Sequence, residues 1–134
     1  MKSCATSVFE PMKILLDTHI FLWWTQNDSR LQSVHRDAIR LPENQIYVSA
    51  ASAWEIGIKR KIGKLAFAGS IADAIAKYRF EALAISVEHA ETAGSLPAIH
   101  TDPFDRLLVA QTYLESITLV TVDEQILRYQ VPHL

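Results

Sequence analysis

The chain has 134 residues, of which 49% are hydrophobic and 21% charged, and this predicts one compact domain with a full core. Its formal net charge of −2 gives no global basic field for nucleic acid, although a local basic patch stays compatible with it. Cys4 is the only cysteine, so an internal disulfide and a cysteine-based zinc site are excluded, which fits a reducing, cytoplasmic setting.

The first eleven residues, MKSCATSVFEP, do not form an export signal, because Glu10 and Pro11 interrupt the apolar stretch that such a signal needs. Met12 follows directly and is itself a plausible start. We therefore interpret residues 1–11 as an extension that is either disordered or a start-site artefact, and assign the fold to a single domain over 12–134. No apolar run reaches the roughly 20 residues of a membrane span.

The domain begins with a run, 13–17, whose hydrophobicity is continuous rather than alternating, which is typical of a strand covered on both faces of a parallel sheet. Residues 29–41 then show apolar side chains at helical spacing, with Ser29 as the expected N-cap and Pro42 just beyond the end. Residues 46–49 predict a second buried strand, and 50–63 a helix that Gly63 ends.

The alternation of helices and strands continues to the end of the chain. Asp102 and Pro103 are a natural N-cap and first-turn residue for one of these helices, and Pro132 restricts the last strand to a sheet edge. Short strands alternating with helices predict a three-layer α/β/α sandwich around a mainly parallel sheet. The remaining predicted elements are a helix at 70–80, a strand at 82–86, helices at 87–96 and 102–116, a strand at 117–123, a helical turn at 124–129 and an edge strand at 131–134.

Acidic residues follow two of the predicted strands, where ligands bind in open α/β sheets. Asp17 closes the first strand and Asp123 follows the strand at 117–123. Taken alone, each is explained equally well as an ordinary strand-to-helix turn residue. At about 100° per residue, Trp54, Ile58 and Ile62 form the apolar arc of the helix at 50–63, and Glu55 falls within it. Glu55 is therefore either a rim residue paired with Lys59 or a functional group on the buried face.

The helix at 102–116 starts with two more acids. Asp102 is explained as a cap, whereas Asp105 also faces the rim where strand ends meet helix starts. Arg106 beside it either steadies a carboxylate or touches a phosphate. The run KRKIGK has two interpretations, a solvated helix end or a patch that follows a phosphate backbone. Its cations are Lys59, Arg60, Lys61 and Lys64.

If Asp17, Glu55, Asp105 and Asp123 converge, their charges repel one another unless a divalent cation lies between them. Carboxylate ligands suit a hard ion, Mg²⁺ or Mn²⁺, and disfavour zinc. Acid-bound ions of this kind activate water in nucleases. Such an ion makes acid–base roles for the histidines unnecessary, so local hydrogen bonding is expected of His19 and His100.

Four segments together resemble the PIN-domain family, and specifically the VapC-type toxins of bacterial toxin-antitoxin pairs. The matching segments are KILLDTHIFLWW (13–24), SAASAWEIGIK (49–59), HTDPFDRLLVAQ (100–111) and LVTVD (119–123). The resemblance implies a five-stranded parallel sheet, bound Mg²⁺ or Mn²⁺, endoribonuclease activity, a homodimer and an inhibitory VapB-type antitoxin.

Carried to this chain, the resemblance implies that Asp17, Glu55, Asp105 and Asp123 are the catalytic metal ligands. Asp102 is then a helix cap or a residue that supports the metal ligands. Thr18 orients Asp17 or contacts a phosphate. Two alternatives stay open. A phosphatase of the haloacid-dehalogenase kind needs a second aspartate where His19 stands, which argues against it, and a non-catalytic module that binds RNA or a partner does not need the acids.

Overall fold

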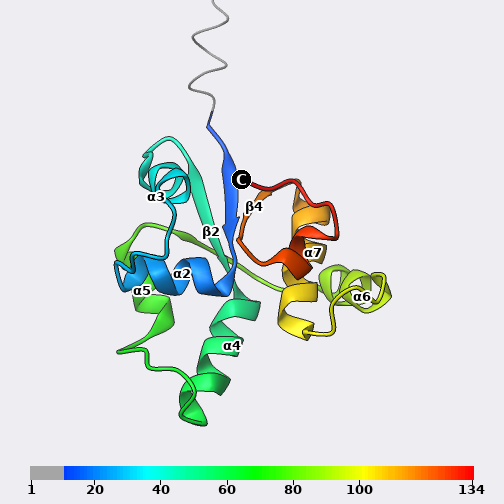
Figure 1. Cartoon of the computed structure of the whole chain (residues 1–134). Coiled ribbons are helices and arrows are strands. Elements are labelled where there is room, and N and C mark those ends of the chain that lie inside the picture. Colours follow the sequence, from blue (N-terminus) through cyan, green and yellow to red (C-terminus); the bar gives the residue numbers. More distant parts are fainter. Residues whose placement is uncertain (1–10) are drawn as a thin grey trace, which may run out of the picture.

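The structure, a computed structural model, describes residues 11–134 (Figure 1). The extension predicted at 1–11 therefore lies outside the described residues, except for Pro11. Among the residues from Pro11 onward, no helix is both long and apolar enough to cross a membrane.

The centre of the fold is a parallel sheet of four strands in the order β3-β2-β1-β4. β1 lies between two neighbours, with Leu15 opposite Tyr47 on one side and Leu119 on the other. The parallel sheet is confirmed, but it has four strands instead of the five expected. The strands are β1 (Lys13–Leu16), β2 (Gln45–Ser49), β3 (Glu81–Leu83) and β4 (Thr118–Val120).

The predicted edge strand at 131–134 is reduced to a single bridge between His133 and Leu119. The Leu119 N–H donates to the Pro132 carbonyl at 2.8 Å, and the Leu134 N–H donates to the Leu119 carbonyl at 3.0 Å. Pro132 itself has no N–H to donate, which is consistent with so short a pairing.

Helices cover both faces of the sheet, giving the predicted three layers (Figure 1). Ile14 and Leu16 of β1 point into one core, with α2, α3 and α5, while Leu15 points into the other, with α7 and α8. All three side chains are fully buried, and this explains why the sequence of the strand is continuously apolar. The helices are α2 (Thr18–Thr25), α3 (Ser33–Arg40), α4 (Ala50–Lys61), α5 (Ile71–Lys77), α6 (Val87–Ser95), α7 (Pro103–Glu115) and α8 (Glu124–Leu127).

The start predicted for the helix at 29–41 was wrong, because α3 begins at Ser33 and Ser29 is not its N-cap. The Asp28 carboxylate accepts hydrogen bonds from both the backbone N–H and the side chain of Arg30, and this local turn holds the preceding residues out of the helix. The predicted end of α4 fares better. The helix stops at Lys61, and Gly63 has a φ of 77°, the left-handed conformation that glycine adopts most readily.

The apolar arc predicted for α4 was only partly right. Glu55 is on the buried face, but Trp54 and Ile62 are each 59% exposed and Ile58 is also exposed. The second half of α4 projects beyond the carboxyl edge of the sheet, so this side of the helix has no core to pack against (Figure 1). Burial of Glu55 thus follows from its position near the sheet edge.

Candidate functional site

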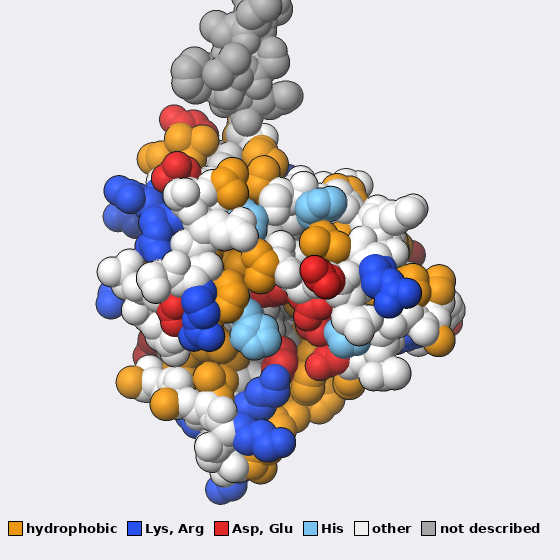
Figure 2. Space-filling model, in the orientation of Figure 1, with side chains coloured by type: hydrophobic (Ala, Val, Ile, Leu, Met, Phe, Trp, Pro, Cys, Tyr) orange, Lys and Arg blue, Asp and Glu red, His pale blue; other side chains and the backbone are white. Residues whose placement is uncertain are grey.

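The acids singled out in the sequence lie on elements that meet at the carboxyl ends of β1, β2 and β4. Asp17 follows β1 and caps α2, and Asp123 follows β4 and caps α8. Glu55 is on the helix that follows β2, and Asp105 is in the first turn of α7. Figure 2 shows acidic side chains gathered in a hollow of the surface, with histidine, lysine and arginine side chains around them.

Asp17 is 3% exposed, and both of its carboxylate oxygens are held. Oδ1 accepts from the Ile20 backbone N–H at 2.9 Å, and Oδ2 accepts from the Thr121 hydroxyl. Burial raises the pKa of Asp17 above its usual value, although these hydrogen bonds act in the opposite direction. A nearby cation stabilises the ionised form of a carboxylate that is buried in this way.

Glu55 is equally buried at 3% exposure and is also held at both oxygens. Oε1 accepts from the Thr18 hydroxyl at 2.7 Å, and the Lys59 ammonium donates to Oε2 at 2.6 Å. Glu55 is therefore on the buried face and is also paired with Lys59. Thr18 orients Glu55 and also lies 2.9 Å from the Ser52 hydroxyl, which corrects the predicted contact with Asp17.

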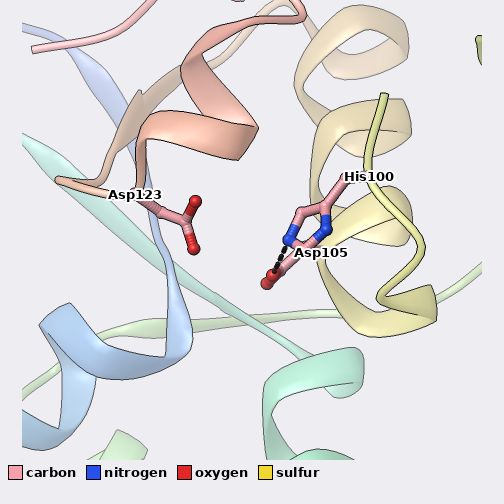
Figure 3. Close-up of side chains that lie close together, drawn as sticks. All are labelled: His100, Asp105 and Asp123. Carbon is pink, nitrogen blue, oxygen red and sulfur yellow. Dashed lines mark hydrogen bonds and ion pairs between the residues drawn. The ribbon is translucent and has the colours of Figure 1, made fainter. Parts of the chain in front are cut away.

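Asp105, Asp123 and His100 point toward one another (Figure 3), with one potential ligand atom from each lying within 4.8 Å of the others. Nε2 of His100 is 2.9 Å from Oδ2 of Asp105. Burial, and then the negative charges of Asp102, Glu55 and Asp17, raise the pKa of Asp105 to about 7. Among the described residues, Asp105 and Asp123 therefore come together, whereas Asp17 and Glu55 lie outside this group of ligand atoms and act on Asp105 through their charges.

His100 is the residue that sequence reasoning undervalued. The predicted hydrogen bond exists, but its ring also belongs to the cluster of potential ligands. The available signal was its position five residues before Asp105 in the segment HTDPFD. Asp102 is confirmed as a cap, because its Oδ1 accepts from the backbone N–H groups of Phe104 at 2.9 Å and Asp105 at 3.1 Å.

Most of the predicted RNA-binding cations have protein partners. Lys59 pairs with Glu55, and the Arg60 guanidinium donates to the carbonyls of Phe67 and Gly69 at 3.1 and 2.8 Å. Arg106 donates to main-chain carbonyls at the end of α6 and in the segment between α6 and α7, which argues against the predicted phosphate contact. Lys61 and Lys64 are exposed.

We expect Arg106→Ala to lower the free energy of unfolding by about 2 kcal/mol, because it removes charge-assisted hydrogen bonds to carbonyls that hold the loop before α7. Urea unfolding followed by circular dichroism measures this change. The matched control, Arg128→Ala at an exposed site, should change the free energy by less than about 0.5 kcal/mol. Equal effects of the two substitutions would show that Arg106 has no special structural role.

Replacement of Lys59 by methionine should lower the free energy of unfolding of the metal-free protein by about 1–2 kcal/mol, because the buried Glu55 carboxylate loses its cation. Since Lys59 is 39% exposed, we expect less than the full cost of breaking a buried pair. Added Mn²⁺ should restore part of the loss. The measurement is a thermal melt with and without Mn²⁺, and an unchanged melting temperature in the metal-free variant contradicts the expectation.

A larger hollow of about 500 Å³ lies between α2 and α5, but the acids of the cluster do not line it. Its walls are formed by Phe67, Tyr78 and other residues of those segments. The candidate site is therefore the group of acids rather than this hollow.

Residues 14–132 match the model of the PIN domain. The chain belongs to the PIN domain family. This agrees with the expected family and with the α/β/α fold around a parallel sheet. A comparison with curated protein sequences finds no match.

Several solved structures share the fold. VapBC2 from Rickettsia felis, bound to a DNA fragment from its promoter, is 17% identical with a TM-score of 0.63 over 92% of this chain and 98% of that one. FitAB bound to the IR36 DNA fragment is 16% identical with a TM-score of 0.59 over 90% and 93% of the two chains. FitAcB from Neisseria gonorrhoeae is 16% identical with a TM-score of 0.54 over 90% and 95%.

Proposed function

We propose that this PIN domain is an endoribonuclease that depends on Mg²⁺ or Mn²⁺ and acts as the toxin of a toxin-antitoxin pair. The observation that carries the proposal is the convergence of Asp105, Asp123 and His100 to within 4.8 Å of one another at the sheet edge. Asp17 and Glu55 lie buried at the same edge, and their negative charges raise the pKa of Asp105.

The residues present fit a hard divalent cation. Their donors are carboxylate oxygens and one imidazole nitrogen, a set that suits Mn²⁺ and Mg²⁺, and the described residues, from Pro11 onward, contain no cysteine. Burial, and then repulsion by the neighbouring acids, raise the pKa of Asp105 to about 7, and a cation among these acids offsets that repulsion. When bound, such an ion lowers the pKa of the attacking water and polarises the phosphate.

The chain's own residues then have distinct roles. Asp17, Glu55 and Asp105 hold the ion, and Asp123 completes the site or positions the attacking water. Thr121 and Thr18 fix the carboxylates of Asp17 and Glu55 through hydrogen bonds. His100 orients Asp105, and Asp102 fixes the backbone at the start of α7, so that the carboxylates need little rearrangement to bind an ion.

The fold shared with VapBC2 and FitAB supports the proposed toxin role, because the sequence motifs also resemble those of VapC-type toxins. We accordingly propose a VapB-type antitoxin as the partner, with the toxin acting on RNA in the cytoplasm.

The exposed apolar residues Trp54, Ile58 and Ile62 support a protein contact at α4, consistent with the proposed homodimer. Light scattering of the purified chain tests that dimer.

Cleavage of total cellular RNA by the purified chain, freed of antitoxin, tests the proposal. We expect cutting in Mg²⁺ or Mn²⁺, none in chelator, and recovery when the ion is restored. Equal cutting under all conditions would indicate a contaminating nuclease. Absence of cutting by the wild type in either ion would instead favour the non-catalytic module that binds RNA or a partner.

A further inference from the structure

A small cavity of about 190 Å³ adjoins the acidic cluster. Thr18 and Glu55 line it, and these same two side chains are joined by the hydrogen bond that positions the Glu55 carboxylate. Whatever occupies the cavity therefore lies next to the proposed cleavage site. Sites for whole small molecules usually have volumes of roughly 300 Å³ or more, and this cavity is smaller. It therefore fits one part of a longer molecule.

One wall of the cavity is aromatic and apolar. Trp23, His19, Leu22 and Leu65 line it, and the rings of His19 and Trp23 have centroids 6.1 Å apart. Trp23 is partly buried against the core, so its indole is held in place. A fixed aromatic ring beside a solvent-open cavity is the feature on which nucleic-acid bases stack.

Cations line the same cavity. Arg30, Lys59 and Lys64 all belong to its lining. Lys59 is paired with Glu55, whereas Lys64 is exposed and Arg30 is 66% exposed despite its ion pair with Asp28. The Arg30 guanidinium also lies 5.1 Å from the centre of the Trp23 ring. A positive and aromatic pocket beside an acidic cluster matches a polyanion with flat bases better than it matches a basic peptide.

We propose that this cavity is the subsite for a single-stranded RNA nucleotide next to the phosphate that is cleaved. The base packs against Trp23, and Lys64 and Arg30 bind the adjoining phosphate. This proposal rests on the proposed nuclease function and adds the form of the substrate to it. A base in a duplex is already stacked and paired, so it cannot enter the cavity without leaving the helix.

The affinity of the purified full chain for a short, fluorescently labelled single-stranded RNA tests the subsite. Fluorescence anisotropy is measured in Ca²⁺, which offsets the charge of the acids, and the steady-state cleavage of the same RNA is measured in Mg²⁺. We expect Trp23→Ala and Lys64→Glu each to weaken binding by about tenfold or more, and to raise KM more than they lower kcat. An RNA duplex should bind about tenfold more weakly than the single strand.

Matched controls separate the subsite from a general loss of charge or aromatic surface. Tyr113→Ala removes an exposed aromatic ring of α7 that does not line the cavity, and Lys13→Glu reverses an exposed charge at the opposite end of β1. Both should leave the affinity within about twofold of the wild type. Because Lys64 is exposed, Lys64→Glu should keep its fold even if Trp23→Ala loses core packing, and thermal melts check both.

The outcomes separate the subsite from the nuclease. Unchanged affinity in Trp23→Ala and Lys64→Glu overturns the subsite, even if the wild type cuts RNA. Failure of the wild type to bind the single strand, or equal affinity for the duplex, also overturns it. A wild type that binds through these residues but cuts no RNA supports the subsite and contradicts the proposed nuclease.

Discussion

Asparagine in place of Asp105 is expected to reduce Mg²⁺-dependent RNA cleavage by about a hundredfold or more. The substitution keeps the size of the side chain but removes a negative charge from the place where Asp105, Asp123 and His100 meet. The effect should be on cleavage rather than on folding, because the Asp102 side chain and the start of α7 are unchanged. The measurement is the initial rate of cleavage of a labelled RNA.

The matched control is Asp37→Asn, which removes one negative charge from the exposed face of α3 and should keep the wild-type rate. Circular dichroism confirms that both variants fold. A rate for Asp105→Asn within a few fold of the wild type would mean that Asp105 does not hold the catalytic ion, and the proposed site would have to be abandoned.

The affinity of the site for a divalent ion should depend on pH because of Asp105. The pKa of Asp105 is raised to about 7 in the metal-free protein, and the carboxyl must lose its proton to bind an ion. The affinity for Mn²⁺ should therefore fall by about tenfold for each pH unit below about 7. Calorimetric titration with Mn²⁺ across this range measures the slope, and a flat profile contradicts the assignment.

The second large effect concerns Asp17, whose replacement by asparagine should abolish cleavage without destabilising the metal-free protein. The pKa of Asp17 is raised by burial, so the folded protein holds this proton to higher pH than the unfolded chain does. Ionisation of Asp17 therefore opposes folding, and stability falls as the pH rises above 3.8, the usual pKa of an aspartate. Asparagine cannot ionise, so at neutral pH the variant should be as stable as the wild type or more so.

Alanine at the same position gives the contrast. It removes the cap of α2 and leaves the Ile20 N–H and the Thr121 hydroxyl without their acceptor, which should cost about 1–3 kcal/mol. Urea unfolding in chelator compares the two variants. If Asp17→Asn loses as much stability as Asp17→Ala, Asp17 is a structural residue and its role as a metal ligand is not supported.

The sequence predicted those features that depend on local physics. The continuous apolar run before Asp17 indicated a strand covered on both faces, Asp102 had the spacing of a cap, and Gly63 ended its helix in a left-handed conformation. The rule that ligands bind at the carboxyl edge of parallel sheets then predicted Asp17 and Asp123 at one edge from the sequence alone.

What the sequence did not reveal depends on tertiary contacts. Periodicity could not show that the outer side of α4 projects past the sheet, so Trp54 was assigned to the buried arc although it is exposed. The partners of Arg106 are carbonyls of a loop whose path no local pattern specifies. His100 looked like a residue with a single local hydrogen bond, and only the folded chain brings it near Asp123.

The most direct test of the central claim, that these acids use a divalent ion to activate water against RNA, is the chemistry of the product ends. Attack by water in Mn²⁺ should leave no 2′,3′-cyclic phosphate, and no product should form in chelator or with Asp105→Asn. Cyclic phosphate ends that also form in chelator would indicate attack by the neighbouring 2′-hydroxyl with histidine acting as acid and base, which contradicts the account.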